Sequence, residues 1–313
     1  MKKAYSLNAA VEQYLHCRTE LGFQLRSEGA VLRSLARYAR QVAHRGPLTT
    51  ALVLRWAQLP ASANPVWWAR RLEIVRRFAC FWIHWDERTE VPPAGIFGSS
   101  HHRPAVHLYS SAEILALLEA AKGFDPTHPL TAAILRTLFG LLAATGLRIS
   151  EALRLQWHDL DWPRGLLLVR HSKFDRSRQI PLHVTTLAAL RDCQRQCRQS
   201  FPAATAVFIT ARGRPLSYDW VRHAFHTLRA DLGWIHQPRP RLHDLRHTFA
   251  INCLIRWYQQ DEDIGNHILG LSTYLGHRRV SDTYWYLSAV PQLLALARKR
   301  WEQQTRRANQ LAL

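Results

Sequence analysis

Near its carboxyl end the sequence contains three short motifs in order: RLHDLRHTFA at 241–250, LGH at 275–277 and TYWY at 283–286. His243 and Arg246 are three residues apart, so on a helix they lie on one face and can reach a single ligand. A guanidinium with imidazole donors beside it suits the non-bridging oxygens of a phosphodiester. The first motif therefore predicts a helix that binds a phosphate.

A second imidazole and a phenol follow. His277 stands after a Leu-Gly turn, and Tyr286 comes nine residues later. A tyrosine hydroxyl beside such a cluster is a candidate nucleophile. Taken singly, the same motifs are also typical of an exposed helix face, a helix end and a core aromatic residue. Tyr284 is a rival nucleophile, but residues i and i+2 of a helix point about 200° apart, so only one tyrosine can face a bound phosphate.

Two further basic residues lie upstream. Arg148 follows the helix stop Thr145-Gly146 in the segment ATGLRISEAL, and short connections on both sides would hold it in place. Taken alone, Arg148 also suits a surface ion pair with Glu151. Lys173 begins a polar turn between two apolar segments within 165–182, a pattern that predicts a β-hairpin.

With these positions in this order, the chain resembles a tyrosine recombinase of the phage-integrase family. The resemblance covers residues 108–295 by motif and the whole length by layout. It implies six catalytic residues: Arg148, Lys173, His243, Arg246, His277 and Tyr286. The glycines common around the family's lysine are replaced here by Ser172 and Phe174, and the nearby basic alternatives are Arg170, Arg176 and Arg178.

The resemblance also implies the mechanism. The two arginines would neutralise the non-bridging oxygens, with the two histidines as hydrogen-bond donors or proton relays, and Tyr286 would attack the phosphorus. Lys173 would protonate the departing 5′ hydroxyl. The resulting 3′-phosphotyrosyl bond keeps the energy of the phosphodiester, so neither ATP, a metal nor another cofactor is expected.

Three activities are compatible with this set of residues. The resemblance favours site-specific DNA recombination, which would serve the integration, excision or transposition of a mobile element. Strand cleavage without exchange, as in type IB topoisomerases, is the second activity. The third is a DNA-binding accessory protein whose site is catalytically silent.

Composition points to the same partner. The chain has 313 residues, with 42 Lys and Arg against 23 Asp and Glu, a formal charge of +19 and a pI near 10.7. Such an excess opposes compaction unless a polyanion binds, and double-stranded DNA fits best. No apolar run is long enough to span a membrane, and the amino terminus lacks the apolar region of a signal peptide, so a cytoplasmic protein without a membrane partner is expected.

The five cysteines form no disulfide framework, which is consistent with reduced thiols. Cys193 and Cys197 are one helical turn apart and could supply half of a metal site. Their neighbourhood offers no Cys or His partner at zinc spacing, so no metal site is expected there.

The fold class predicted is mainly α with a small β-hairpin or sheet, in the two-domain architecture of tyrosine recombinases. Residues 1–89 are expected to form a helical, SAM-like core-binding domain, 90–107 a linker, and 108–313 the catalytic domain with a carboxyl-terminal helix. In the first domain, helices over 27–44 and 65–86 would bury one apolar stripe each and turn arginines toward DNA.

The carboxyl-terminal helix is expected to begin at Pro291 and to carry a narrow apolar stripe of Leu294, Ala297 and Trp301. The family resemblance implies a homotetramer on paired sites, alone or with related recombinases, in which this helix docks into the adjacent protomer. The alternative is that the stripe packs on its own domain.

Overall fold

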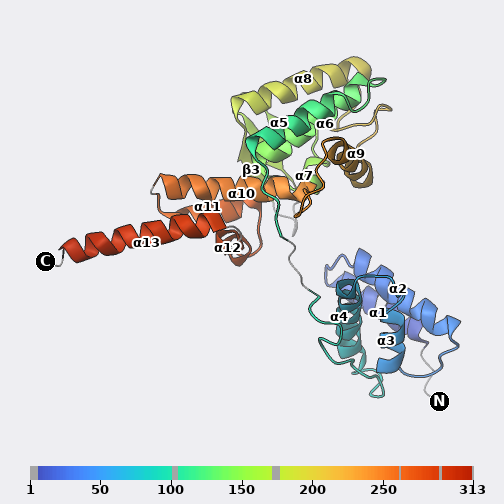
Figure 1. The fold of residues 1–313 in the computed structure, drawn as a ribbon. Helices are drawn as coiled ribbons and strands as arrows, with labels where there is room; N and C mark the ends of the chain where they lie inside the picture. The colour runs from blue at the N-terminus through green and yellow to red at the C-terminus, as the bar shows by residue number, and fades with distance from the viewer. Residues whose placement is uncertain (1–5, 101–104, 171–176, 261, 289–290, 312–313) are drawn as a thin grey trace. The chain divides into compact units, whose positions relative to one another are not determined.

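A computed structural model of the protein describes residues 6–100, 105–170, 177–260, 262–288 and 291–311. The chain forms two compact units, Met1–Pro104 and Ala105–Leu313. Both are built mainly from helices, and the second contains a three-stranded sheet, so the predicted fold class is confirmed (Figure 1). No helix in the described ranges is long and apolar enough to cross a membrane.

The first unit is a bundle of four helices: α1 (Leu7–Glu20), α2 (Arg26–Gln41), α3 (Thr50–Ala57) and α4 (Pro65–Trp82). Helix α4 starts where Asn64 caps its first turn and Pro65 occupies the first helical position, and it contacts the other three helices. The bundle closes around side chains such as Leu32, Leu35 and Phe78, all fully buried.

The apolar stripe expected on the 65–86 helix is only partly buried. Trp67 and Trp85 at its two ends are 42% and 58% exposed. The arginines of this helix were expected to turn toward DNA, but Arg71 is buried. Its guanidinium lies 3.6 Å from the ring centroid of Trp56 and donates a hydrogen bond to the carbonyl of Ala57. A cation held between indole faces and carbonyls has a structural role in this unit.

The predicted linker, residues 90–107, starts within the first unit. Val91 and Phe97 pack against the bundle core, and the ring of Phe97 meets that of Trp68 edge-on at 5.9 Å. Residues 101–104 of this segment lie outside the described residues. The division between the two units falls after Pro104.

The second unit holds the remaining elements: α5 (Ser111–Lys122), α6 (Pro129–Thr145), α7 (Ile149–Ala152), the 3-10 helix η1 (Trp157–Asp159), β1 (Leu160–Asp161), β2 (Leu166–Val169), β3 (Arg178–Pro181), α8 (Val184–Ser200), α9 (Tyr218–Asp231), α10 (Leu242–Gln259), α11 (Ile264–Leu275), α12 (Ser281–Ser288) and α13 (Pro291–Leu311). The strands pair antiparallel in the order β1-β2-β3, with Leu167 opposite Ile180, so the predicted hairpin is confirmed.

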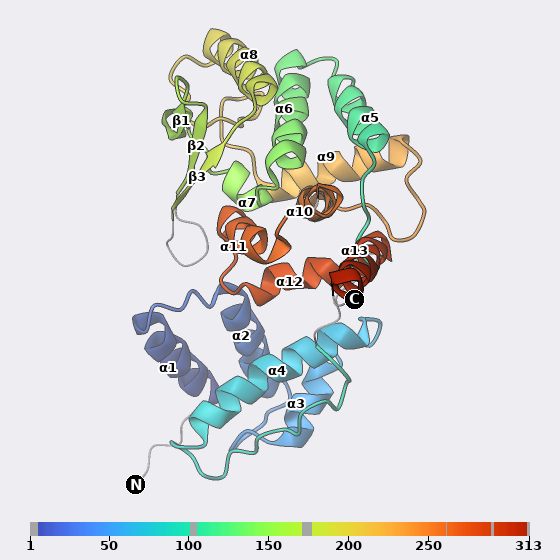
Figure 2. The same ribbon diagram turned by 90° about the vertical axis from the view of Figure 1, so that its left-hand side faces the viewer.

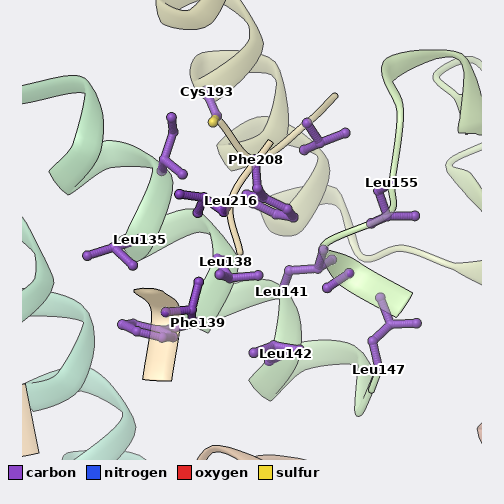
Figure 3. Close-up of a cluster of buried hydrophobic side chains, with 14 of the residues drawn as sticks. Leu135, Leu138, Phe139, Leu141, Leu142, Leu147, Leu155, Cys193, Phe208 and Leu216 are labelled. Carbon is purple, nitrogen blue, oxygen red and sulfur yellow. The ribbon is translucent and has the colours of Figure 1, made fainter. Parts of the chain in front are cut away.

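The main core of this unit surrounds α6, which contacts α5, α8 and α10. Figure 3 shows Leu138, Phe139 and Leu142 of α6 in one buried cluster that also includes Phe208 and Cys193. Cys197 is buried in the same core. Leu115 of α5 is 61% exposed, because the buried face of that short helix is formed by Leu117 and Ala121.

Helix α10 is the element around which the remaining helices meet. It contacts α6, α11, α12 and α13, and Figures 1 and 2 show it running between them. A second core, which includes Ile251, Leu254 and Leu275, joins these helices. The carboxyl ends of α6 and α11 and the middle of α12 are thereby brought to one side of α10.

The ends of α6 and α11 depend on two glycines in the left-handed region. Gly146 has φ +61°, and a β-carbon there would lie 2.6 Å from a ring atom of Phe249. We expect Gly146→Ala to lower the free energy of unfolding by about 2 kcal/mol, because both strain and overlap oppose it. Urea unfolding would measure the change.

The matched control is Gly270, a helical glycine of α11 with open space around its α-carbon. Gly270→Ala should raise the free energy of unfolding by about 0.5–1 kcal/mol, since alanine favours helix. Equal effects of the two substitutions would contradict this explanation of the helix end.

Candidate active site

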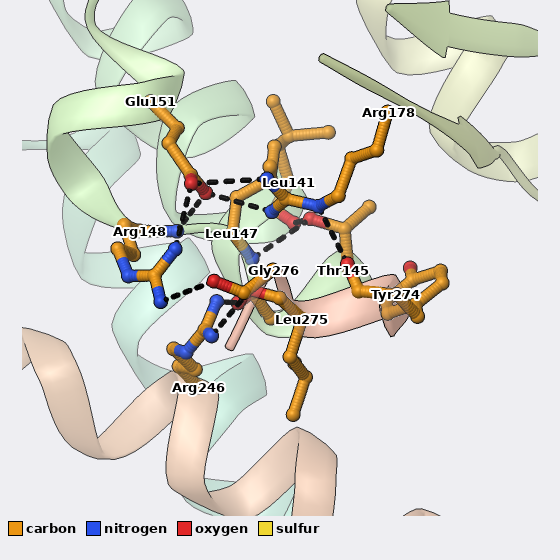
Figure 4. A network of polar contacts seen from close by, with 11 residues as sticks. Leu141, Thr145, Leu147, Arg148, Glu151, Arg178, Arg246, Tyr274, Leu275 and Gly276 are labelled. Atoms are coloured by element: carbon orange, nitrogen blue, oxygen red, sulfur yellow. Dashed lines mark hydrogen bonds and ion pairs between the residues drawn. The ribbon is translucent and has the colours of Figure 1, made fainter. Parts of the chain in front are cut away.

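Two predicted site residues, Arg148 and Arg246, are held by the carbonyl ends of two helices (Figure 4). Arg246 donates to the carbonyl of Gly146 at 2.8 Å and to that of Leu275 at 2.6 Å. Arg148 donates to the carbonyl of Gly276 at 2.9 Å. These carbonyls terminate α6 and α11, where helix dipoles are negative and favour cations. The two arginines are therefore fixed next to each other by the backbone.

Glu151 is the buried carboxylate of this cluster, with its side chain 1% exposed. It accepts hydrogen bonds from Arg148 at 2.9 Å and from Arg178 of β3 at 2.9 and 3.1 Å. Burial alone would raise the pKa of Glu151, but the hydrogen bonds and charge of Arg178, followed by those of Arg148, lower that pKa to about 2. The predicted pair of Arg148 with Glu151 exists, and it forms part of a larger network.

Arg178, one of the basic alternatives to Lys173, belongs to the same network. Arg178 donates to Glu151 and to the carbonyl of Tyr274 at 2.6 Å, and its side chain is 10% exposed. Arg170 pairs with Asp159. Lys173 itself lies outside the described residues, as does Arg176.

The cluster has more positive than negative groups. Arg246 is 2% exposed and has no carboxylate within ion-pair distance in the described ranges. Burial and the charge of Arg148 lower the pKa of Arg246 to about 10, so it remains charged near neutral pH. Together, Arg148, Arg178 and Arg246 face the single carboxylate of Glu151, an arrangement that favours binding of an anion.

The two predicted histidines are neutral near pH 7. Loss of solvation, together with the charge of Arg246, lowers the pKa of His243 to about 4, although the residue as a whole is exposed to solvent. Burial and the charges of Arg246 and Arg148 likewise lower the pKa of His277 to about 4. Nδ1 of His277 lies 2.7 Å from the hydroxyl of buried Thr283. Each neutral ring offers one donor and one acceptor nitrogen.

The two tyrosines of α12 have opposite environments. Tyr286 is 2% exposed, and its ring stacks on that of His277 with centroids 6.1 Å apart and planes at 22°. Tyr284 is 51% exposed. Of the two, it is the Tyr286 ring that belongs to the cluster with the arginines and histidines.

A third histidine of the cluster was not predicted. His247 stands four residues after His243 on α10, and its Nδ1 lies 3.2 Å from the hydroxyl oxygen of Tyr286. The i, i+4 spacing of the two histidines in RLHDLRH could have identified it. The contact between Glu151 and Arg178 gave no comparable signal, because it joins segments 27 residues apart along the chain.

One group of side chains in the described part of the chain could hold a metal ion: His107, Glu113 and His236, with ligand atoms within 4.8 Å of one another. Glu113 also forms the capping box of α5 with Ser110, and one of its oxygens lies 3.0 Å from His107 Nε2. This group contains none of the predicted site residues.

The carboxylate of Glu151 predicts a specific acid sensitivity. Because its folded-state pKa of about 2 lies below the ordinary value of 4.5, ionisation favours the folded state above pH 4.5, and this contribution is lost as the pH falls toward 2. The contribution at pH 7 is on the order of 3 kcal/mol. Glu151→Gln should therefore unfold at lower urea concentration at pH 7, and its difference from wild type should narrow toward pH 3. Parallel stability curves from pH 7 to pH 3 would contradict this role.

Comparisons with known proteins identify the family of this chain. The model of the Phage integrase family matches residues 109–292. Two proteins of Sinorhizobium fredii (strain NBRC 101917 / NGR234), each named as an integrase/recombinase, align over nearly their full lengths. The first, y4rB, is 38% identical over 95% of this chain and 98% of its own. The second, y4rE, is 34% identical over 94% of this chain and 95% of its own length.

Solved structures share the fold at lower identity. The Tn1549 transposon integrase in complex with transposon right end DNA has a TM-score of 0.69 and 16% identity, over 96% of this chain and 99% of that chain. A lambda integrase tetramer bound to a Holliday junction has a TM-score of 0.66 and 18% identity, over 91% and 78%. From the family match and the full-length relatives, the chain belongs to the phage integrase family and is a tyrosine recombinase.

Proposed function

We propose that the protein performs site-specific DNA recombination by forming a 3′-phosphotyrosyl bond through Tyr286. The observation that carries this assignment is the burial of Tyr286 among His247, His277 and the carbonyl-anchored Arg246, while Tyr284 is exposed. The structure of the Tn1549 transposon integrase contains transposon right end DNA, which supports the proposal that this protein recombines the DNA of a mobile element.

The proposed step exchanges one ester for another. The hydroxyl of Tyr286 loses its proton to water and its oxygen bonds to the phosphorus. The bond from phosphorus to the 5′ oxygen breaks, and Lys173 supplies the proton that this oxygen takes up. Arg148 and Arg246 neutralise the non-bridging oxygens, and His243 and His277 donate hydrogen bonds beside them. The reverse attack by another 5′ hydroxyl rejoins the strand without ATP.

The proposed division of labour follows the two units. The first would contact the DNA backbone as a core-binding domain, and the second would hold the scissile phosphate. Exposed arginines on α2 and α4 support backbone contact by the first unit: Arg37, Arg40, Arg70 and Arg77. Arg33 is also exposed, but it pairs with Glu12 at 2.7 Å. Phosphate contacts of this kind bind DNA without reading its sequence.

Covalent trapping distinguishes the proposal from a silent accessory protein. Nicked duplexes that tile the DNA flanking the gene would be incubated with wild type, Tyr286→Phe and Tyr284→Phe. We expect a protein–DNA adduct with wild type and Tyr284→Phe and none with Tyr286→Phe, because Tyr286 is the proposed nucleophile and Tyr284 is exposed outside the cluster.

DNA affinity, measured by gel shift, should be nearly the same for all three proteins. An adduct with Tyr286→Phe, or none with Tyr284→Phe, would reject the assignment of the nucleophile. Gel shifts without any adduct from wild type would favour the accessory role. An adduct that reseals but never exchanges strands between two duplexes would favour the topoisomerase-like activity.

Strand exchange between two duplexes is proposed to require four protomers coupled through α13. Leu293 of this helix is 1% exposed in its own unit, whereas Leu294 and Trp301 are 54% and 66% exposed. Exposed apolar side chains beside basic ones favour docking on a neighbour over packing in the same unit. The lambda integrase neighbour is described as a tetramer on a Holliday junction, which supports the same assembly here.

The assembly predicts that Leu294→Ser combined with Trp301→Ser leaves the free energy of unfolding within about 0.5 kcal/mol of wild type. Binding of a single site should be retained, while synapsis of two sites and recombination should fall at least tenfold. Sedimentation of the protein on paired sites would measure synapsis. Leu293→Ala is the control for local packing, and it should cost about 2–5 kcal/mol. Wild-type recombination by the double variant would contradict docking through this helix.

A further inference from the structure

His247 is fixed in position by aromatic neighbours. Its ring meets that of His243 edge-on at 4.6 Å between centroids, with the planes at 85°. Trp285 and Tyr286 of α12 lie 5.4 and 5.5 Å from it. His247 therefore joins α10, which carries the phosphate-binding residues, to α12, which carries the tyrosine.

The geometry points to a positioning role: we infer that His247 holds the hydroxyl of Tyr286 through a hydrogen bond at Nδ1, so that the oxygen is oriented for attack. The Nδ1 to hydroxyl distance is 3.2 Å. This inference rests on the proposed function, because it takes Tyr286 as the nucleophile. His277 contacts the same tyrosine differently, by stacking on its ring, and its own Nδ1 is engaged by Thr283.

The protonation state of His247 separates positioning from proton transfer. Burial is the largest cause that lowers the pKa of His247, and together with the charges of His243, Arg241, Arg246 and His277, in that order, it brings this pKa to about 3. These groups come from α10 and from the connection between α11 and α12, and Tyr286 faces the ring from α12. The ring is therefore neutral near pH 7 and can accept a hydrogen bond.

A base this weak cannot take the phenolic proton efficiently. An ordinary tyrosine has a pKa near 10, so transfer of its proton to a ring whose pKa is about 3 is unfavourable by roughly ten-million-fold. Orientation does not require that transfer. A hydrogen bond that fixes the hydroxyl keeps its oxygen in line with the leaving oxygen for more of the time. A small misplacement of the attacking oxygen would lower the reaction rate strongly.

Three substitutions test the inference. His247→Asn keeps a hydrogen-bonding atom as many bonds from the β-carbon as Nδ1 but cannot titrate. His247→Gln is also a polar amide, but it moves that atom toward the Nε2 position, and His247→Phe keeps the ring without any hydrogen bond. The readout is the single-turnover rate of adduct formation from pH 6 to pH 9 on the nicked duplex that wild type cleaves.

We expect the Phe and Gln variants to form the adduct about tenfold more slowly, the scale of one lost hydrogen bond. The Asn variant should stay within about threefold of wild type and keep its pH profile, and DNA affinity should be unchanged in all three. Thermal melting identifies any variant that fails to fold, and the Asn and Gln pair remains informative if Phe unfolds.

Two results would overturn the inference: wild-type rates for both Phe and Gln, or a loss for Asn as large as that for Gln. The latter would indicate proton transfer. Tyr286→Phe in the same assay keeps the two proposals distinct, since an adduct from that variant rejects the nucleophile itself. A different result rejects only the role of His247: Tyr286→Phe forms no adduct, while His247→Phe and His247→Gln form it at the wild-type rate.

Discussion

The binding of two guanidinium groups by helix-end carbonyls is the interaction on which the rest of this site depends. Arg246 is buried with carbonyl partners from the ends of α6 and α11, and Arg148 shares the second of these ends. A helix end exposes carbonyls that need donors, and a buried guanidinium needs acceptors. Each therefore satisfies the other, and Gly146 and Gly276 provide the backbone turns that make both ends available.

This arrangement leaves the arginines strongly oriented and incompletely neutralised. Glu151 balances part of the charge through Arg148 and Arg178, while the carbonyls that bind Arg246 supply only partial charges. A phosphodiester would complete the balance, since its oxygens bring a full negative charge. In the same cluster, His247 and His277 contact Tyr286 at its hydroxyl and at its ring, respectively. One helix thus relates the phosphate-binding groups to the tyrosine.

Local signals in the sequence predicted much of this. The Thr145-Gly146 stop, the hairpin strands and the helix that begins at Pro291 all follow from rules that involve neighbouring residues. The pairing of Glu151 with Arg178 could not be found this way, because Arg178 lies 27 residues away and its contact depends on how β3 meets α7. Arg71 was misjudged for a related reason: periodicity places a residue on a face but does not reveal carbonyls or indole rings that another helix brings to it.

The charge on the scissile phosphate gives the most direct test of the central claim. A duplex with one methylphosphonate at the cleaved position lacks the negative charge that Arg148 and Arg246 are held to receive. Adduct formation by Arg148→Ala and Arg246→Ala should be far slower than wild type on the ordinary phosphate, because the charge goes unneutralised. On the neutral methylphosphonate the difference from wild type should shrink at least tenfold. An equally large loss on both substrates would contradict the account, since the arginines would then act through something other than the charge of the phosphate.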